Sequence, residues 1–189
     1  MHTSSPLLTE KSEGLFQMLF HHQENNFIFN IGMEYISFHS ISGYAGYPIF
    51  EQEFIEPIIT IVNELITDIK ILGGSFTYVN VFPLNEIELK NNWFTFIPVS
   101  DKGFSEFTFI TKLDNETTEG KTIDLIDGAT NLQNNQGERF FRLNLTSLIE
   151  YNNTVYYLKD VKQISKQLHD RARLLFSNNE GEKLTNYIQ

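Results

Sequence analysis

The hydrophobic and polar positions of this chain repeat with two periods, one typical of strands and one typical of helices. Between residues 27 and 41, apolar side chains recur at every second position, which predicts a strand. These side chains are Phe27, Phe29, Ile31, Met33 and Tyr35. A shorter apolar run over 15–20 precedes them across a polar turn, so the two segments are expected to form a hairpin.

Further strands are expected where β-branched and aromatic residues gather between turns of Asn, Asp and Gly. They are predicted over 75–82, 93–99, 104–113, 121–126, 139–148 and 154–158. No crossover helix fits between these segments, so their connections should be antiparallel. The polar, Asn- and Gln-rich stretch 128–137 is interpreted as a mobile loop.

A first amphipathic helix follows the turn residues 43–48 and is expected to end at Gly73 and Gly74. Its apolar side at helical spacing consists of Phe50, Phe54, Ile58, Ile61, Val62, Leu65, Ile66 and Ile69. This side, including Ile61 and Leu65, should pack on the sheet. Pro57 lies inside the helix and should either kink it or mark the first turn of a restarted helix.

A closing helix is predicted from about Lys159 to Phe176. Its apolar stripe consists of Val161, Ile164, Leu168, Ala172 and Leu175. A basic stripe occupies the opposite side and consists of Lys159, Lys162, Lys166, His169 and Arg173. The basic stripe is expected to face outward. It is a candidate docking surface for an acidic partner, a second copy or a phosphate backbone. The alternative is an ordinary helix face exposed to solvent, which would show the same residues.

These elements predict an α+β fold, with an antiparallel β-sheet of about six or seven strands and two amphipathic helices packed on one face. Residues 1–13 are polar and without periodicity, so they are expected to form a flexible arm. Residues 14–189 are then expected to form a single domain.

Short motifs at the element boundaries resemble a sporadically distributed family of uncharacterised bacterial proteins. The chain begins its first helix with Tyr47-Pro48-Ile49-Phe50, continues with the strand Thr77-Tyr78-Val79-Asn80, and carries His169 and Phe176 on its closing helix. The family shows the same order of a Tyr-Pro-x-aromatic helix start, a Thr-Tyr-Ile-Asn strand, and a helix with His and Phe. The resemblance implies structural roles for Tyr47, Pro48, Phe50, Tyr78, Asn80 and Phe176. Its patchy occurrence implies a bacterial accessory locus such as phage defence, and it supplies no catalytic residue.

Composition narrows the classes of function. The 189 residues include no cysteine, which excludes disulfides, thiol nucleophiles and cysteine metal sites. A net charge of −10 disfavours general binding to nucleic acid, which stays possible only through the basic stripe. No stretch has the apolar length of a signal peptide or a membrane span, so a cytoplasmic location is expected.

Catalytic motifs are missing from the sequence. It contains no Gly-x-Ser-x-Gly, no phosphate-binding loop and no dinucleotide fingerprint, and its histidines lack metal-ligand spacing. An acidic cluster could in principle hold Mg²⁺ beside Lys121, but its spacing matches no compact metal motif, and turn chemistry explains it better. The cluster consists of Asp114, Glu116, Glu119, Asp124, Asp127 and Glu138. No cofactor, metal or catalytic residue is therefore predicted.

Aromatic side chains are abundant, with 17 Phe and 8 Tyr. Two helices cannot cover both faces of one sheet, so some rings, with Phe107 and Phe109 as candidates, are expected to meet a partner. The leading hypothesis is a non-enzymatic interaction protein that binds a protein partner or itself. The alternatives are a small-ligand-binding domain with an apolar cavity between the sheet and the last helix, and a metal-dependent nuclease.

Overall fold

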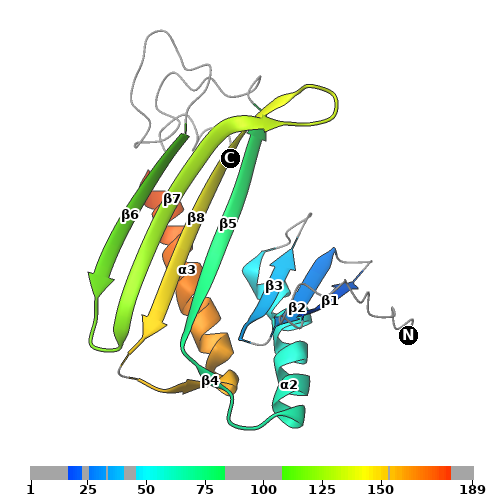
Figure 1. Cartoon of the computed structure of the whole chain (residues 1–189), viewed down its shortest axis with the longest axis vertical. Helices are drawn as coiled ribbons and strands as arrows, with labels where there is room; N and C mark the ends of the chain where they lie inside the picture. Colours follow the sequence, from blue (N-terminus) through cyan, green and yellow to red (C-terminus); the bar gives the residue numbers. More distant parts are fainter. Residues whose placement is uncertain are drawn as a thin grey trace. The chain divides into compact units, whose positions relative to one another are not determined.

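The structure, a computed structural model, describes residues 17–22, 26–32, 34–40, 46–83, 108–152 and 154–179 (Figure 1). The chain divides into two units, Met1–Thr67 and Asp68–Gln189. Each unit has its own β-sheet structure and its own helix.

The first unit contains a three-stranded antiparallel sheet in the order β1-β2-β3. Its strands are β1 (Gln17–His22), β2 (Phe27–Gly32) and β3 (Ile36–Ser40). The hairpin prediction is confirmed for β1 and β2. The single long strand predicted over 27–41 is wrong, because a turn divides it: the N–H of Gly32 donates a hydrogen bond to the carbonyl of Tyr35 over 2.9 Å. A Cβ at residue 32 would overlap the ring of Tyr35, so any other residue here would displace that exposed ring.

The helix of the first unit is interrupted by a turn of π-helix. It consists of α1 (Tyr47–Phe50), the π-helical turn η1 (Glu51–Ile55) and α2 (Glu56–Leu65). A π-turn closes its hydrogen bonds at i→i+5 and so holds an extra residue. The buried positions accordingly shift by one residue across it, from Tyr47, Phe50 and Phe54 to Ile55, Ile59 and Val62.

This shift overturns part of the predicted apolar face. Ile61 and Leu65 were assigned to the core, but they are 55% and 77% exposed. The helical wheel assumed a constant 100° per residue, which the π-turn breaks. The helix also ends at Leu65 and not at the glycines, since Gly73 and Gly74 begin a strand.

Pro57 lies in the first turn of α2, directly after the π-turn. The sequence left open whether Pro57 kinks the helix or marks the first turn of a restarted helix, and the structure shows the second. The prolyl ring cannot accept the i→i−4 geometry of an uninterrupted α-helix, and the wider turn before it removes the conflict. Five phenylalanines pack together in the core of this unit: Phe27, Phe29, Phe38, Phe50 and Phe54. The ring centroids of Phe27 and Phe54 are 4.8 Å apart, which ties β2 to the helix.

The second unit is built on a four-stranded antiparallel sheet in the order β5-β8-β7-β6. Its strands are β5 (Gly73–Pro83), β6 (Thr108–Glu116), β7 (Gly120–Gln133) and β8 (Arg139–Tyr151). A small second sheet pairs β4 (Lys70–Ile71) with β9 (Tyr156–Tyr157). The 3-10 turn η2 (Leu158–Asp160) then leads into α3 (Val161–Asn179).

Helix α3 covers one face of the four-stranded sheet and contacts β5 and β8 (Figure 1). The alternation along β8 shows which face this is, because every odd residue from Phe141 to Tyr151 is buried. Phe141, Leu143 and Leu145 form the centre of the core with Ile126 of β7. Towards the start of α3, the buried side chains of Ile164 and Leu168 pack on Ile149 and Tyr151.

The α+β class with antiparallel sheets is therefore confirmed, but the strands form sheets of three, two and four strands in place of one. The two helices belong to different units. The strand predicted over 93–99 lies outside the described residues. Within the described residues, no helix is long and apolar enough to cross a membrane.

The segment predicted as a loop over 128–137 is mostly strand. Residues 128–133 belong to β7, with an irregularity in the pairing between Ala129 and Leu132. The rest is a tight turn organised by Asn134, whose side-chain oxygen accepts hydrogen bonds from the N–H groups of Gln136 and Glu138. The polar composition of this segment has two sources. The side-chain amide of Asn134 binds the backbone N–H groups of the turn, and the strand carries polar residues among its positions.

Candidate functional site

A buried ion pair joins the sheet of the second unit to α3. Asp124 of β7 lies opposite Ser147 of β8, on the face that α3 covers, and its carboxylate is buried. Arg171 of α3 donates two hydrogen bonds of 2.7 Å, from Nε to Oδ1 and from Nη2 to Oδ2. Ser147 donates a third, of 2.9 Å, to Oδ1. This bidentate geometry holds the pKa of Arg171 above its usual value. The pair fixes α3 against the sheet.

The acidic cluster is divided between the two faces of the sheet. Asp124 points towards α3, whereas Asp114 and Asp127 lie at alternate positions whose side chains point to the other face. Asp114 binds Lys112 at 3.1 Å and Lys121 at 3.4 Å, and these lysines, Lys112 first, lower its pKa. Since strand alternation separates these carboxylates, they cannot surround one ion. The described residues contain no group of three potential metal ligands.

His169 does not belong to an outward-facing basic stripe. It is buried, and its ring lies against Phe76 and Tyr78 of β5, with centroids 5.3 Å and 5.7 Å away. Its Nδ1 is 2.9 Å from Oδ1 of Asp170. The correction has a simple cause: the buried arc of α3 is wider than the predicted apolar stripe and includes the flank over β5.

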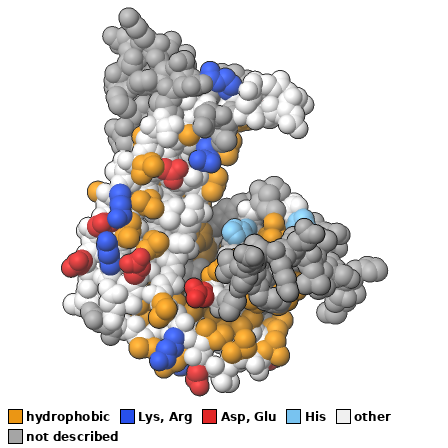
Figure 2. Space-filling model, viewed as in Figure 1, with side chains coloured by type: hydrophobic (Ala, Val, Ile, Leu, Met, Phe, Trp, Pro, Cys, Tyr) orange, Lys and Arg blue, Asp and Glu red, His pale blue; other side chains and the backbone are white. Residues whose placement is uncertain are grey.

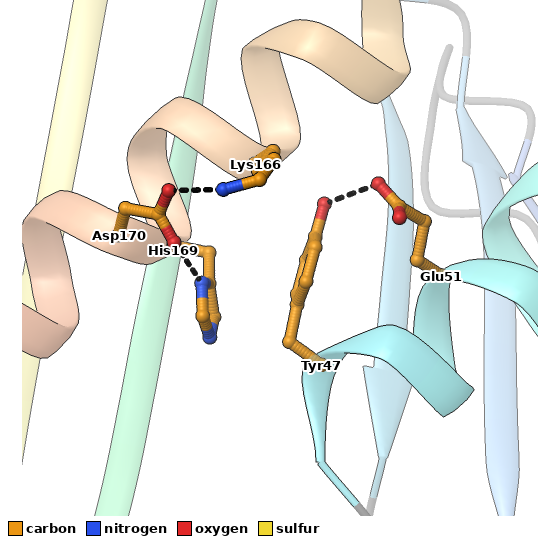
Figure 3. A network of polar contacts seen from close by, with 5 residues as sticks. All are labelled: Tyr47, Glu51, Lys166, His169 and Asp170. Atoms are coloured by element: carbon orange, nitrogen blue, oxygen red, sulfur yellow. Dashed lines mark hydrogen bonds and ion pairs between the residues drawn. The ribbon is translucent and has the colours of Figure 1, made fainter.

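The rest of the stripe is exposed but partly neutralised. Lys166 binds Asp170, the carboxylate that also meets His169, and these two partners, Lys166 first, lower the pKa of Asp170 (Figure 3). Lys159 lies 5.7 Å from the ring centroid of Tyr157. Lys162 and Arg173 are exposed. Asp170 lies among these cations, so the local positive field is weaker than the basic residues alone indicate.

Most residues of the sequence resemblance take packing positions. In the first unit, Tyr47 is buried and donates a 3.0 Å hydrogen bond from its hydroxyl to Oε1 of Glu51, as Figure 3 shows. Pro48 is exposed in the first turn of α1, and Phe50 belongs to the phenylalanine core. In the second unit, Tyr78 and Phe176 pack against the core cluster around Phe141. Asn80 of β5 is half-buried, and its side-chain Nδ2 has no hydrogen-bond partner within the described parts of the chain.

In the described part of the second unit, the face of the sheet opposite α3 is exposed along the outer strands β5 and β6, although Ile123 of β7 on this face is buried. We name it the open face. Its most exposed apolar residues are Val79, Val81 and Ile110, at 61%, 52% and 74%. Asp127 lies between Asn144 and Ile110 and accepts a 3.0 Å hydrogen bond from Nδ2 of Asn144, and Arg142 lies 4.0 Å from the same carboxylate. Apolar and charged side chains therefore alternate on this surface, as Figure 2 shows for the sheet. Within the described parts of the second unit, no helix or strand covers it.

The predicted partner-binding rings are placed differently. Phe109 of β6 is half-buried on the face towards α3, and a Cβ at Gly128 would overlap the rings of Phe109 and Phe141. The missing side chain of Gly128 thus leaves room for the ring of Phe109 to pack in the core. Phe107 lies outside the described residues.

Two features were not predicted from the sequence. One is the ion pair between Asp124 and Arg171, and the other is the mixture of apolar and charged side chains on the open face. The alternation in 121–127 was a usable signal, because it separates Asp124 from Asp127 and predicts opposite faces. Comparison of the chain with models of protein families, with curated proteins and with solved structures found no match.

Proposed function

We propose that the protein is a non-enzymatic interaction protein whose open face binds a protein partner or a second copy of the chain. One observation carries this proposal: three β-branched side chains, Val79, Val81 and Ile110, are more than half exposed around the polar group Asp127, Asn144 and Arg142. A large apolar side chain pointing to water from the middle of a strand stabilises little unless a second surface covers it.

The chemistry of this surface fits a protein partner. Binding hot spots pair desolvated apolar contacts with a few oriented polar groups, and Arg is enriched among them. Arg142 has a buried Nε without a hydrogen-bond partner within the described residues, while its side chain remains accessible beside Asp127. A partner carbonyl or carboxylate can bind the exposed part of this guanidinium.

The two alternative functions find less support. The space between α3 and the sheet is occupied by buried side chains, among them Ile164, Leu168 and Ala172. This packing favours a core over a ligand cavity. The nuclease hypothesis needs converging carboxylates, and Asp124 is engaged by Arg171 on the other face from Asp114 and Asp127. The resemblance in the sequence motifs is what connects the interaction role to a bacterial accessory locus such as phage defence.

The test compares two valines of similar exposure. Val79 lies on the open face, and Val155 lies in the segment before β9. Val79→Lys and Val155→Lys add the same charge at 61% and 58% exposed positions. Light scattering after size-exclusion chromatography measures assembly of the protein alone and mixed with purified products of neighbouring genes. We expect Val79→Lys to abolish the complex and Val155→Lys to retain it.

Two outcomes would overturn the proposal. One is that Val79→Lys weakens no assembly, of the protein alone or with a neighbour's product, more than Val155→Lys does, since no interface would then lie on the open face. The other is a protein that stays monomeric, assembles with no neighbour, and cleaves nucleic acid when Mg²⁺ is added. Circular dichroism of both variants controls for loss of the fold.

A further inference from the structure

Strand β6 forms an exposed edge of the four-stranded sheet. It pairs with β7 on one side, and within the described residues it has no strand on the other. Every residue of 110–116 is exposed, on both faces of the sheet, which differs from the alternating burial of β5 at the opposite edge. Such an edge offers unpaired backbone groups to a further strand.

The hairpin between β6 and β7 shows which backbone groups point outward. Thr117 donates its N–H to the carbonyl of Gly120 over 2.8 Å, which closes a two-residue turn. Hydrogen-bonded and non-hydrogen-bonded pairs alternate along an antiparallel ladder. The N–H and C=O groups that point away from β7 therefore belong to Ile110, Lys112, Asp114 and Glu116.

We propose that a second copy of the chain pairs with this edge, β6 antiparallel to β6, about a two-fold axis at Leu113. The proposal goes beyond the proposed function, because it uses the edge strand β6 and leaves the open face accessible to a further partner. In this register Lys112 of each copy lies opposite Asp114 of the other, on the same face, and exchanges outward backbone hydrogen bonds with it. Leu113, which is 50% exposed, lies opposite the Leu113 of the second copy.

Charge selects this register over its neighbours. Opposite residues in an antiparallel pair share a face, so the axis must pass through a residue. An axis at Lys112 or Asp114 would set like charges against each other, and one at Asn115 would set Asp114 against Glu116. An axis at Thr111 pairs Lys112 with Ile110 and gains no attraction. An axis at Asp114 also pairs Lys112 with Glu116, but it sets the two Asp114 carboxylates against each other. Across 111–115, only the axis at Leu113 pairs opposite charges without also pairing like charges, and it does so twice.

The register also explains how an edge strand that carries charged side chains can still pair with a second copy. Lysines on edge strands prevent indiscriminate strand addition. Lys112 repels the register that pairs it with itself and attracts Asp114 in the register at Leu113, so the same side chain contributes to specificity. Because the contact is isologous, it uses β6 of both copies and closes at a dimer.

A pair of charge reversals tests the register. Lys112→Glu alone sets two carboxylates opposite each other at both ends of the contact, and Asp114→Lys alone sets two ammonium groups opposite each other. Each variant should dimerise about tenfold more weakly or worse. Mixed in equal amounts, the two variants should form a mixed dimer of nearly wild-type affinity, since every opposing pair is again attractive. Lys70→Glu, an exposed reversal on β4, is the matched control and should change nothing.

Cysteine pairing gives an independent measure, because the chain has no cysteine of its own. Leu113→Cys should form a disulfide between copies under mild oxidation, since a non-hydrogen-bonded pair brings the Cα atoms to about 4.5 Å. Thr111→Cys and Asn115→Cys should cross-link poorly alone and well when mixed. Equal cross-linking by all three variants, or failure of the mixed dimer, overturns the edge pairing. If the assembly is unchanged in the β6 variants but lost in Val79→Lys, the edge pairing is overturned and the proposed function of the open face is retained.

Discussion

The two faces of the four-stranded sheet use the same strands for opposite purposes. Under α3, β8 contributes an unbroken series of buried residues from Phe141 to Tyr151, and the one buried carboxylate of β7, Asp124, is bound by Arg171. On the open face, the alternate residues of β5 and β6 are exposed, and the carboxylates of Asp114 and Asp127 meet lysine and amide groups near water.

The difference shows that stability and binding are separated by the two-residue period of the strands. A substitution under α3 acts on the core, whereas its neighbour one position along acts on the surface. The exposed positions of the open face can therefore change without loss of the fold, which is the property that an interaction surface requires.

The largest contrast is expected between two leucines of β8. Leu145 is fully buried under α3, and Leu148 is half-buried on the open face. Leu145→Ala should lower the free energy of unfolding by about 2–5 kcal/mol because it leaves a cavity. Leu148→Ala should cost about 1 kcal/mol, since less of its surface leaves water on folding. Urea denaturation measures both, and equal losses would remove the distinction between the faces.

The next effect concerns the buried ion pair. Arg171→Ala leaves the carboxylate of Asp124 buried with Ser147 as its remaining partner, and should cost about 3 kcal/mol. Arg173→Ala, an exposed change on the same helix, serves as the control and should stay within about 0.5 kcal/mol. If thermal unfolding of the two variants were alike, Asp124–Arg171 would not hold α3.

Tyr151 gives a pH-dependent effect on the covered face. Burial raises the pKa of its phenol to about 12 from 10.0, and the hydroxyl has no hydrogen-bond partner within the described residues. A raised pKa means that the native state keeps its proton longer, so this stabilisation is complete below pH 10.0 and is lost as the pH rises towards about 12.

Tyr151→Phe should accordingly leave stability at neutral pH unchanged or slightly higher, because it removes an unpaired polar group. Between pH 10 and about 12, the free energy of unfolding of the wild type should fall more steeply than that of the variant. Denaturant titrations at several pH values across this range check the slopes. Parallel slopes would show that the phenol reaches water in the native state.

The smallest effects are expected at the carboxylates on the open face and the hairpin turn. Asp114→Ala, Glu116→Ala and Glu119→Ala should each change the free energy of unfolding by less than about 0.5 kcal/mol. All three residues are exposed, although Lys112 and Lys121 lower the pKa of Asp114. A loss well above this limit at Asp114, seen in calorimetry, would mean that the open face contributes to folding after all.

The sequence predicted the class of the fold and most strands well, because apolar alternation is a local signal. It failed where geometry departs from a regular period. One extra residue in the turn Glu51–Ile55 moved the core positions to Ile59 and Val62, and no propensity marks a π-turn. The division of 27–41 into two strands was also missed, although Gly32 permits the turn.

The candidate site was harder to predict, since its partners are far apart in the chain. Asp124 and Arg171 are 47 residues apart, and only the placement of α3 over this face of the sheet brings them together. Single-sequence patterns predict which face a residue occupies but not which helix will cover that face. The error in placing His169 was smaller, because this residue lies at the border of the apolar stripe. A helical wheel does not show whether a side chain at this border is exposed to water or packs against the rings of Phe76 and Tyr78.

The π-turn in the helix of the first unit has a consequence for any comparison between this sequence and its homologues. The turn spans Glu51–Ile55 and contains one residue more than an α-helical turn would. A homologue without it would be aligned correctly only by a single-residue gap inside a helix, where gaps are usually penalised most heavily. An ungapped alignment would match Ile61 of this chain, which faces water, with a core position of the homologue. The two halves of the helix should therefore be aligned separately, on either side of the π-turn.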